Sequence, residues 1–464
     1  MNFIPSYKNS FRILKGGKIS LVVSSFLAST TLTFAAPSGG VVTSGSANIS
    51  QNGKVTDITQ STQKVSINWN KFNIASDETV NFKQPNSSSI TLNRVVGNEK
   101  SIINGALNVN GQVWIINSNG VLFGKGASIN TSGLLATTKD ISDSDFQAGN
   151  YKFTGNSKES VINLGTIDVV NNGSVILAAN EVKNEGTIKA IRGKIHLAGA
   201  DEYTVNLNGN SLVNLIVNKG VLDALVKNSG TIIANGGEVY LTTNAVNELL
   251  KGVVNNTGVI EANSLAGITG HVELFAHGGT ANVAGTINAT DGFVETSGRE
   301  FNINKDTTIK TKTWLIDPTN LTVEDATAYN TALNNGTDTI IQTNNTSGSD
   351  EGNIYINDEI TWDKDAKLTL DAQNDIFINK EITASNGKLE LLYGQKAVAT
   401  GNTADYYINA PVNLKAGDNF ITKLGSNGNA ITWTVVTDAA AMQAMTLENN
   451  NKNYALGNNI TLTR

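Results

Sequence analysis

The chain has 464 residues, of which only 16% are charged, with 34 basic and 40 acidic side chains. All four charges in the first 35 residues are positive, so removing this segment lowers the formal net charge from −6 to −10. Such a chain lacks the basic patch that polyanions require, and we expect no nucleic-acid partner. Cysteine is absent, which excludes disulfide bonds, thiolate catalysis and cysteine-ligated zinc.

Residues 1–35 predict a secretory signal peptide. Four basic residues precede an uncharged apolar run over residues 19–34, and Ala35 and Ala36 follow it directly. A basic start, an apolar middle and small residues at the end are the layout of a cleaved signal. The run is short and interrupted by Ser and Thr, which argues against a membrane anchor. We therefore expect a mature chain outside the cytoplasm.

Residues 37–80 lack the repeat found farther on, and Trp69, Phe72 and Phe82 lie close together in the sequence. The first edge of a repetitive β-structure has to be covered. This stretch therefore predicts an N-terminal cap.

Two short patterns recur after the cap. One is Asn, a spacer, Gly, any residue and Ile, and the other is Gly, any residue, Val or Ile, any residue and Leu. The first begins at Asn163, Asn184, Asn228 and Asn256, and the second at Gly173, Gly193, Gly237 and Gly270. Clear copies lie roughly 20 to 22 residues apart, or about twice that where one copy is blurred, a period that suits one coil of a β-solenoid.

The second pattern gives the orientation of the side chains. Val175 and Leu177 alternate with Ser174 and Ile176, so on a strand the first pair points inward and the second toward solvent. We expect each Gly to turn a corner at positive φ, where a Cβ would clash. The predicted fold is all-β, a right-handed parallel β-helix (β-solenoid) with an N-terminal cap.

The repeat is interrupted in two places. Apolar residues run through 203–225 without the Gly corner of the repeat, which predicts an insertion packed on the solenoid. Beyond Arg299 the spacing loosens, and a short helix is expected around Val323 to Leu333. Residues 301–464 are expected to hold further β-rich or β-helical repeats, and the strand-like, uncapped end from Asn458 to Arg464 suggests a truncated chain.

A family resemblance enters at residues 111–138 (GQVWIINSNGVLFGKGASINTSGLLATT) and 81–97 (NFKQPNSSSITLNRVVG). These stretches resemble the N-terminal secretion domain of two-partner secretion exoproteins, the filamentous haemagglutinin family. The resemblance covers about residues 37–300. It implies a two-partner secretion (haemagglutination activity) domain over residues 36–300.

The family's two asparagine-proline turns correspond to two stretches of this chain. The Asn-Pro-Asn-Gly turn is here Asn117, Ser118, Asn119 and Gly120, without the proline. The Asn-Pro-Asn-Leu turn corresponds best to Gln84, Pro85, Asn86 and Ser87. Through this resemblance we predict that Pro85, Asn86, Asn117, Ser118, Asn119 and Gly120 form turns that serve export.

The resemblance further implies a partner and a location. Such exoproteins cross the inner membrane and then pass unfolded through an outer-membrane barrel transporter with periplasmic docking domains. The expected product is a secreted or cell-surface adhesin or haemagglutinin. Its polar face is a candidate surface for host glycans or surface proteins.

Two alternatives stay open. A secreted carbohydrate-active β-helix enzyme would need aligned acids, and acidic pairs occur at Asp350/Glu351, Asp358/Glu359 and Asp363/Asp365. A cytolysin or contact-dependent inhibition toxin would carry an effector beyond the secretion domain. His196 and His271 fall at outward positions, where a solvated strand face is expected. We therefore predict no catalytic residues, no metal site and no cofactor.

Overall fold

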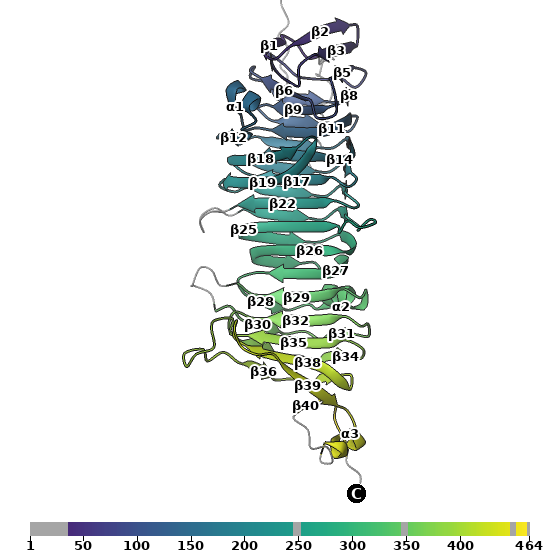
Figure 1. Ribbon diagram of the computed structural model, residues 1–464, viewed down its shortest axis with the longest axis vertical. Helices are drawn as coiled ribbons and strands as arrows, with labels where there is room; N and C mark the ends of the chain where they lie inside the picture. The colour runs from purple at the N-terminus through teal and green to yellow at the C-terminus, as the bar shows by residue number, and fades with distance from the viewer. Residues whose placement is uncertain (1–35, 245–251, 345–350, 446–451, 462–464) are drawn as a thin grey trace, which may run out of the picture. The chain divides into compact units, whose positions relative to one another are not determined.

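The computed structural model describes residues 36–244, 252–344, 351–445 and 452–461, so the predicted signal peptide lies outside the described residues. The described chain is a parallel β-helix, and its strands stack in chain order (Figure 1). Each coil of the first two thirds contributes strands to three columns, and each strand pairs in parallel with the strand one coil away. None of the helices within these ranges has the length and apolarity needed to cross a bilayer.

The first column runs from the N-terminal cap to residue 311. Its strands are β3 (Val55–Gln60), β5 (Thr79–Lys83), β8 (Ala106–Val109), β11 (Ser128–Thr137), β14 (Thr166–Ala179), β16 (Thr187–Ala190), β21 (Thr231–Ile233), β24 (Val259–Glu261), β26 (Thr286–Ile303) and β27 (Thr308–Asp317). Strands β11, β14, β26 and β27 bend at irregular positions and continue into the second column.

The second column is the longest. Apart from those four continuing strands, it consists of β4 (Lys64–Trp69), β6 (Ile90–Val95), β9 (Gln112–Ile116), β17 (Lys194–Gly199), β22 (Glu238–Asn244), β25 (His271–Val283), β29 (Asp338–Gln342), β32 (Lys367–Asp371), β35 (Lys388–Tyr393) and β38 (Gly417–Leu424).

The third column closes each coil with short strands. They are β7 (Ser101–Ile103), β10 (Val121–Phe123), β13 (Ser160–Asn163), β15 (Glu181–Asn184), β20 (Leu225–Asn228) and β23 (Val253–Asn256), followed by the ends of β25 and β26. Toward the C-terminus two smaller sheets take over, β28 (Leu321–Val323), β30 (Ile354–Ile356), β33 (Ile376–Ile378) and β36 (Tyr406–Ile408), and β31 (Ile360–Trp362), β34 (Ile382–Ala384) and β37 (Val412–Leu414).

The predicted inward positions form the core. Val175 aligns with Ile195, Ile195 with Val239, and Val239 with Val272, and all four side chains are fully buried. Stacking at about 4.8 Å pairs the backbones and lines up these side chains at the same time. The orientation read from the second pattern is confirmed for this set.

The recurrent asparagines form a second internal row. Asn163, Asn184, Asn228 and Asn256 are fully buried, and each of the first three donates from Nδ2 to the Oδ1 of the next at 2.8 Å. Buried amides need such partners because an unpaired polar group in the interior is costly. The row therefore fixes which coils stand next to each other.

Replacing Asn228 by Ala should lower the free energy of unfolding by about 2–4 kcal/mol, because it leaves buried amides of its neighbours unpaired. Asn409 is an exposed asparagine that donates to Asn379 at 2.8 Å and serves as the control. Asn409→Ala should cost less than about 0.5 kcal/mol. Equal losses for the two variants in denaturant unfolding would contradict a stabilising role specific to the buried row.

The prediction that the glycines of the second pattern adopt positive φ is wrong. Gly173, Gly193 and Gly237 do not have positive φ. A Cβ on Gly193 would instead lie 1.9 Å from the carbonyl oxygen of Gly173, and one on Gly237 would lie 2.1 Å from that of Gly193. Glycine is required there because successive backbones approach too closely for a side chain.

The N-terminal end is capped as predicted. Strand β2 (Ala47–Asn52) forms an antiparallel hairpin with β3, and β1 (Val41–Ser44) pairs antiparallel with β4. At the other end, β39 (Ile431–Val436) pairs antiparallel with β38, and β40 (Asn453–Leu456) pairs with β39. The expected strand over Asn458 to Arg464 is not found at Asn458–Thr461, while residues 462–464 lie outside the described chain.

The predicted insertion and the predicted helix are both present. The insertion is an antiparallel hairpin of β18 (Glu202–Asn208) and β19 (Ser211–Lys219), which β12 (Lys152–Thr154) extends. Helix α2 (Thr327–Asn334) overlaps the expected stretch and ends one residue beyond it, and two shorter helices are α1 (Asp143–Ala148) and α3 (Ala439–Ala444).

The outward face of the second column is not solvated where the hairpin covers it. Ile176, expected to face water, is only 2% exposed and belongs to a second apolar cluster with Trp114, Phe153 and Tyr203. His196 was also expected on a solvated face and is 6% exposed, whereas His271 is partly exposed. The hairpin and α1 thus create an outer core against the solenoid.

Candidate functional site

The first predicted export turn, Asn117–Gly120, is a closed turn. The amide of Gly120 donates to the carbonyl of Asn117 at 2.9 Å, and the amide of Asn119 donates to Asn117 Oδ1 at 2.9 Å. Gly120 has φ +98°, which suits glycine at this place. The side-chain amide of Asn117 supplies the order that the missing proline would otherwise add.

This turn is also anchored to the neighbouring coils. The fully buried Asn117 donates from Nδ2 to Glu99 O at 2.9 Å and to Ser101 Oγ at 3.0 Å. Asn119 donates to Gly97 O at 3.0 Å, and Ser157 Oγ donates to Ser118 O at 2.6 Å. Its conformation therefore depends on the coils on both sides.

The second predicted turn contains Pro85 and Asn86, which are exposed. The amide of Ser89 donates to Asn86 O at 3.1 Å, and Asn86 Oδ1 accepts from the amide of Ser88 at 3.0 Å. Gln84, which stands where the family has its first Asn, is buried. Its Nε2 donates to Thr91 Oγ1 and to Gln112 O, both at 2.9 Å. A longer amide thus holds this turn to the solenoid.

The two turns do not form one site. Gly111, whose amide donates to Gln84 Oε1, directly precedes strand β9, and Asn117 directly follows that strand. Its five residues span about 17 Å at the usual rise of a strand. The six predicted residues therefore lie at opposite ends of the strands, on the two edges of the second column.

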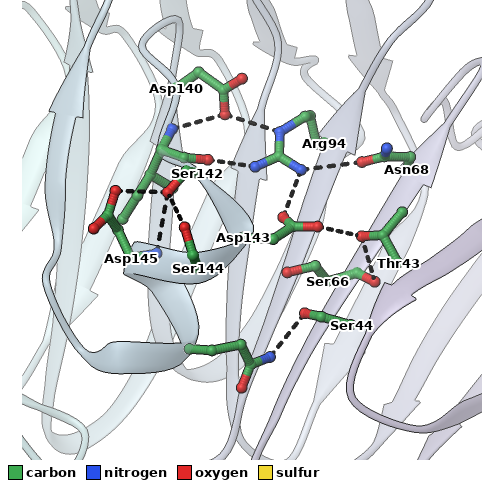
Figure 2. A network of polar contacts seen from close by, with 12 residues as sticks. Thr43, Ser44, Ser66, Asn68, Arg94, Asp140, Ser142, Asp143, Ser144 and Asp145 are labelled. Atoms are coloured by element: carbon green, nitrogen blue, oxygen red, sulfur yellow. Dashed lines mark hydrogen bonds and ion pairs between the residues drawn. The ribbon is translucent and has the colours of Figure 1, made fainter.

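A polar network that the sequence did not single out links the cap, the solenoid and α1 (Figure 2). Arg94 of β6, only 13% exposed, donates from Nε to Asp140 at 2.9 Å and from Nη1 to Asp143 at 2.8 Å. It also donates to Asn68 and to the carbonyl of Ile141. One guanidinium thus joins three segments that are far apart in the sequence.

Hydrogen bonds also hold both ends of helix α1. Ser142 caps its first turn by accepting from the amide of Asp145 at 3.0 Å. Asp143 accepts from Thr43 at 2.6 Å, and at the helix C-terminus Lys64 donates to the carbonyls of Phe146 and Gln147, both at 3.1 Å. Through Thr43 and Lys64, α1 holds β1 and β4.

The charges of this network are mutually stabilised. Burial opposes ionisation of Asp143, but hydrogen bonds from Thr43 and Arg94 outweigh it and hold the pKa of this carboxyl below its ordinary value. Burial likewise opposes the charge of Arg94, whereas Asp140 and Asp143 raise its pKa. In the sequence this network is represented only by Arg94 at an outward strand position and by Asp140 and Asp143 farther along the chain. Only the fold reveals that these three side chains are close together.

The described members of the acidic pairs considered for catalysis lie mostly at the surface. Glu359, Asp363 and Asp365 are exposed, Asp358 accepts from the amide of Ala326 at 2.9 Å, and Asp350 lies outside the described residues. Across the described ranges, no group of three or more His, Asp or Glu side chains has a geometry that could hold a metal ion.

Two other acids have unusual environments. Burial raises the pKa of Asp317 and that of Asp371, each to about 6, and neighbouring Glu295 adds to the effect at Asp317. Oδ1 of each is buried and has no hydrogen-bond partner among the described residues. Both lie on outward positions of the second column, separated by β29.

Asp317→Asn should therefore stabilise the protein at neutral pH. A carboxyl whose folded pKa exceeds its unfolded value favours folding below pH 3.8, and this contribution is lost as the pH rises through about 6. Since Asp317 keeps some contact with solvent, we expect a gain of about 1–2 kcal/mol at pH 7.5 and none at pH 3.5. The exposed Asp363→Asn is the control, and a pH-independent gain in urea unfolding would refute the assignment.

Comparisons with known proteins agree with this geometry. A family model described as the TPS secretion domain matches residues 33–289. The chain is 35% identical over 251 residues to a heme/hemopexin-binding protein of Haemophilus influenzae strain Rd, which is 52% of this chain and 27% of that protein. A second Haemophilus influenzae heme/hemopexin-binding protein is 29% identical over 287 residues, 56% of this chain and 30% of that protein.

A solved structure is similar over most of the chain. The HMW1 secretion domain from Haemophilus influenzae has a TM-score of 0.55 and 25% identity, covering 84% of this chain and 99% of that domain. The chain spans less than a third of the length of the two curated relatives. Because the family model matches more than half of its residues, the chain belongs to the family of two-partner secretion domains.

Proposed function

We propose that residues 36–300 direct export of an adhesin through an outer-membrane barrel transporter with periplasmic docking domains. The observation that carries the proposal is the match of the TPS secretion domain to a capped, cysteine-free parallel β-helix. A chain without cysteine cannot be locked by a disulfide before it is threaded. Outside the cell, each coil that folds offers a template for the next.

In this proposal the turns Asn117–Gly120 and Gln84–Ser89 carry part of the export signal. The second turn supports this role because Pro85 and Asn86 are exposed, so a partner can reach them without unfolding the coil. Residues 1–35 act as the signal peptide, and the product is secreted or held at the cell surface, where its polar faces bind host glycans or surface proteins. It has no catalytic activity.

The test is secretion of the chain from a Gram-negative host that also produces the transporter. Deleting residues 81–138 should abolish release into the medium. Asn86→Ala should reduce release several-fold with little loss of stability, whereas the control Asn409→Ala, also exposed and hydrogen-bonded, should leave it unchanged. Release of the deletion variant at the wild-type level would refute the proposal.

A second candidate function comes from the relatives. Both curated relatives are heme/hemopexin-binding proteins, so binding of hemopexin or of its heme is the alternative to adhesion. Surface plasmon resonance with immobilised hemopexin, with and without heme, distinguishes the two. Saturable binding supports this alternative, and its absence favours adhesion.

A further inference from the structure

A groove lies beside the insertion hairpin. One wall is strand β19, with Leu212, Val213 and Leu215, and the floor is the outward face of β17, β22 and β25, with His196, Tyr240 and Phe275. Its volume is about 400 Å³, within the range of binding sites. The export turns described above do not line it.

Two buried polar atoms at this groove have no partner. His196 is 6% exposed, and its Nε2 accepts or donates no hydrogen bond in the described chain. Oδ1 of Asn244, which also lines the groove, is likewise unpaired. Burial lowers the pKa of His196 to about 3, so the ring is neutral at physiological pH. Buried polar atoms are normally hydrogen-bonded, so these two unpaired atoms mark the groove as unusual.

The wall of the groove is a free strand edge. Strand β19 pairs with β18 on one side, and no described strand pairs with the other. Two carbonyls of β19 accept hydrogen bonds from side chains instead. Lys194 Nζ donates to Val213 O at 3.0 Å, and Asn244 Nδ2 donates to Val217 O at 3.5 Å. Val213 and Ile216 expose 50% and 47% of their surface. An open apolar edge of this kind is a template for another strand.

The floor beside this edge is acidic. Glu273 lines the groove and aligns with Glu295 in the next coil. Burial raises the pKa of Glu295, and Glu273 adds to the shift. Lys194, the one Lys or Arg among the described residues that line the groove, already pairs with Glu238 at 2.7 Å. A basic side chain would therefore be attracted here, and an acidic one repelled.

We propose that this groove docks an extended segment of a partner protein that adds to the free edge of β19. The segment alternates apolar side chains, which lie beside the exposed Val213 on the solvent side of the added strand, with basic ones, which point to the floor of the groove and approach Glu273. Its backbone replaces Lys194 and Asn244 as the partner of the β19 carbonyls. The proposal does not depend on the export route or on adhesion.

The test uses a labelled, end-blocked seven-residue peptide of alternating valine and lysine with the mature chain, followed by fluorescence anisotropy. We expect a dissociation constant of about 10–100 μM. Val213→Lys should weaken binding at least tenfold. The matched control Val170→Lys, at a valine on β14 that is 52% exposed and does not line the groove, should leave it unchanged.

Two control peptides separate strand pairing from charge. A peptide with alternate N-methylated amides cannot form the ladder and should not bind, and one with glutamate for lysine should bind at least tenfold more weakly. Hydrogen exchange of the unsubstituted chain should slow at residues 211–219 when the lysine peptide is added, which holds even if a variant fails to fold. Failure of the lysine peptide to bind, unchanged exchange at β19, or equal binding of the N-methylated peptide would overturn the proposal.

Discussion

Gly193→Ala is expected to lower the free energy of unfolding by about 3 kcal/mol or more, because a methyl group there must displace backbone. The new Cβ would lie 1.9 Å from the carbonyl oxygen of Gly173, a distance that real Cβ atoms do not show. Gly173 belongs to the adjacent coil, so relief of the clash separates two strands of the second column. Denaturant unfolding of the protein measures the loss.

The matched control is Gly401→Ala. This glycine has no atom within 4 Å of a built Cβ and no positive φ. We expect a change of less than about 0.5 kcal/mol. If both variants lost the same stability, close contact between coils would not be the reason for the glycine pattern.

Arg94→Ala is expected to cost about 2–4 kcal/mol, because it leaves Asp140 and Asp143 without the cation between them. The loss should be local at first, with faster hydrogen exchange in α1 and in β1, which Thr43 ties to Asp143. The exposed pair of Lys71 and Glu99 provides the control. Lys71→Ala should cost no more than about 1 kcal/mol.

The cost of Arg94→Ala should also depend on pH. Asp143 has a lowered folded pKa, so its pair stabilises the protein above the ordinary value of 3.8 and is lost as the pH falls through the folded value. The difference between wild type and variant should therefore shrink below pH 4. A constant difference down to pH 2 would mean that Arg94 acts through packing of its side chain alone.

The sequence was informative about the repeat because the repeat is local. Val175 and Leu177 were assigned to the core from period-two alternation, and both are fully buried. The Asn and Gly patterns marked the coils correctly, although the glycines serve close backbone contact and not positive φ. A contact between coils cannot be inferred from one coil by itself.

What the sequence missed depends on segments that are distant in the chain. Ile176 and His196 occupy outward positions, and only the position of the β18–β19 hairpin decides that they are buried. Arg94 lies 49 residues before Asp143, so no local pattern predicts their pairing. Hydrogen-bonded turns occur at Asn117–Gly120 and at Asn86–Ser89, the second of which begins two residues after the Gln84 named from the sequence, and their separation by the length of β9 follows from the coil geometry.

The most direct test of the parallel stacking is a disulfide between coils in the secreted chain, which has no cysteine of its own. Asn108 and Asn130 are aligned on adjacent coils, and their side chains are hydrogen-bonded at 3.1 Å. The double variant Asn108→Cys/Asn130→Cys should cross-link rapidly under mild oxidation, because a strand spacing of about 4.8 Å suits a disulfide. Asn108→Cys/Lys189→Cys, with Lys189 two further coils along the column, should not. Rapid cross-linking of the second pair, or none of the first, would contradict the parallel β-helix.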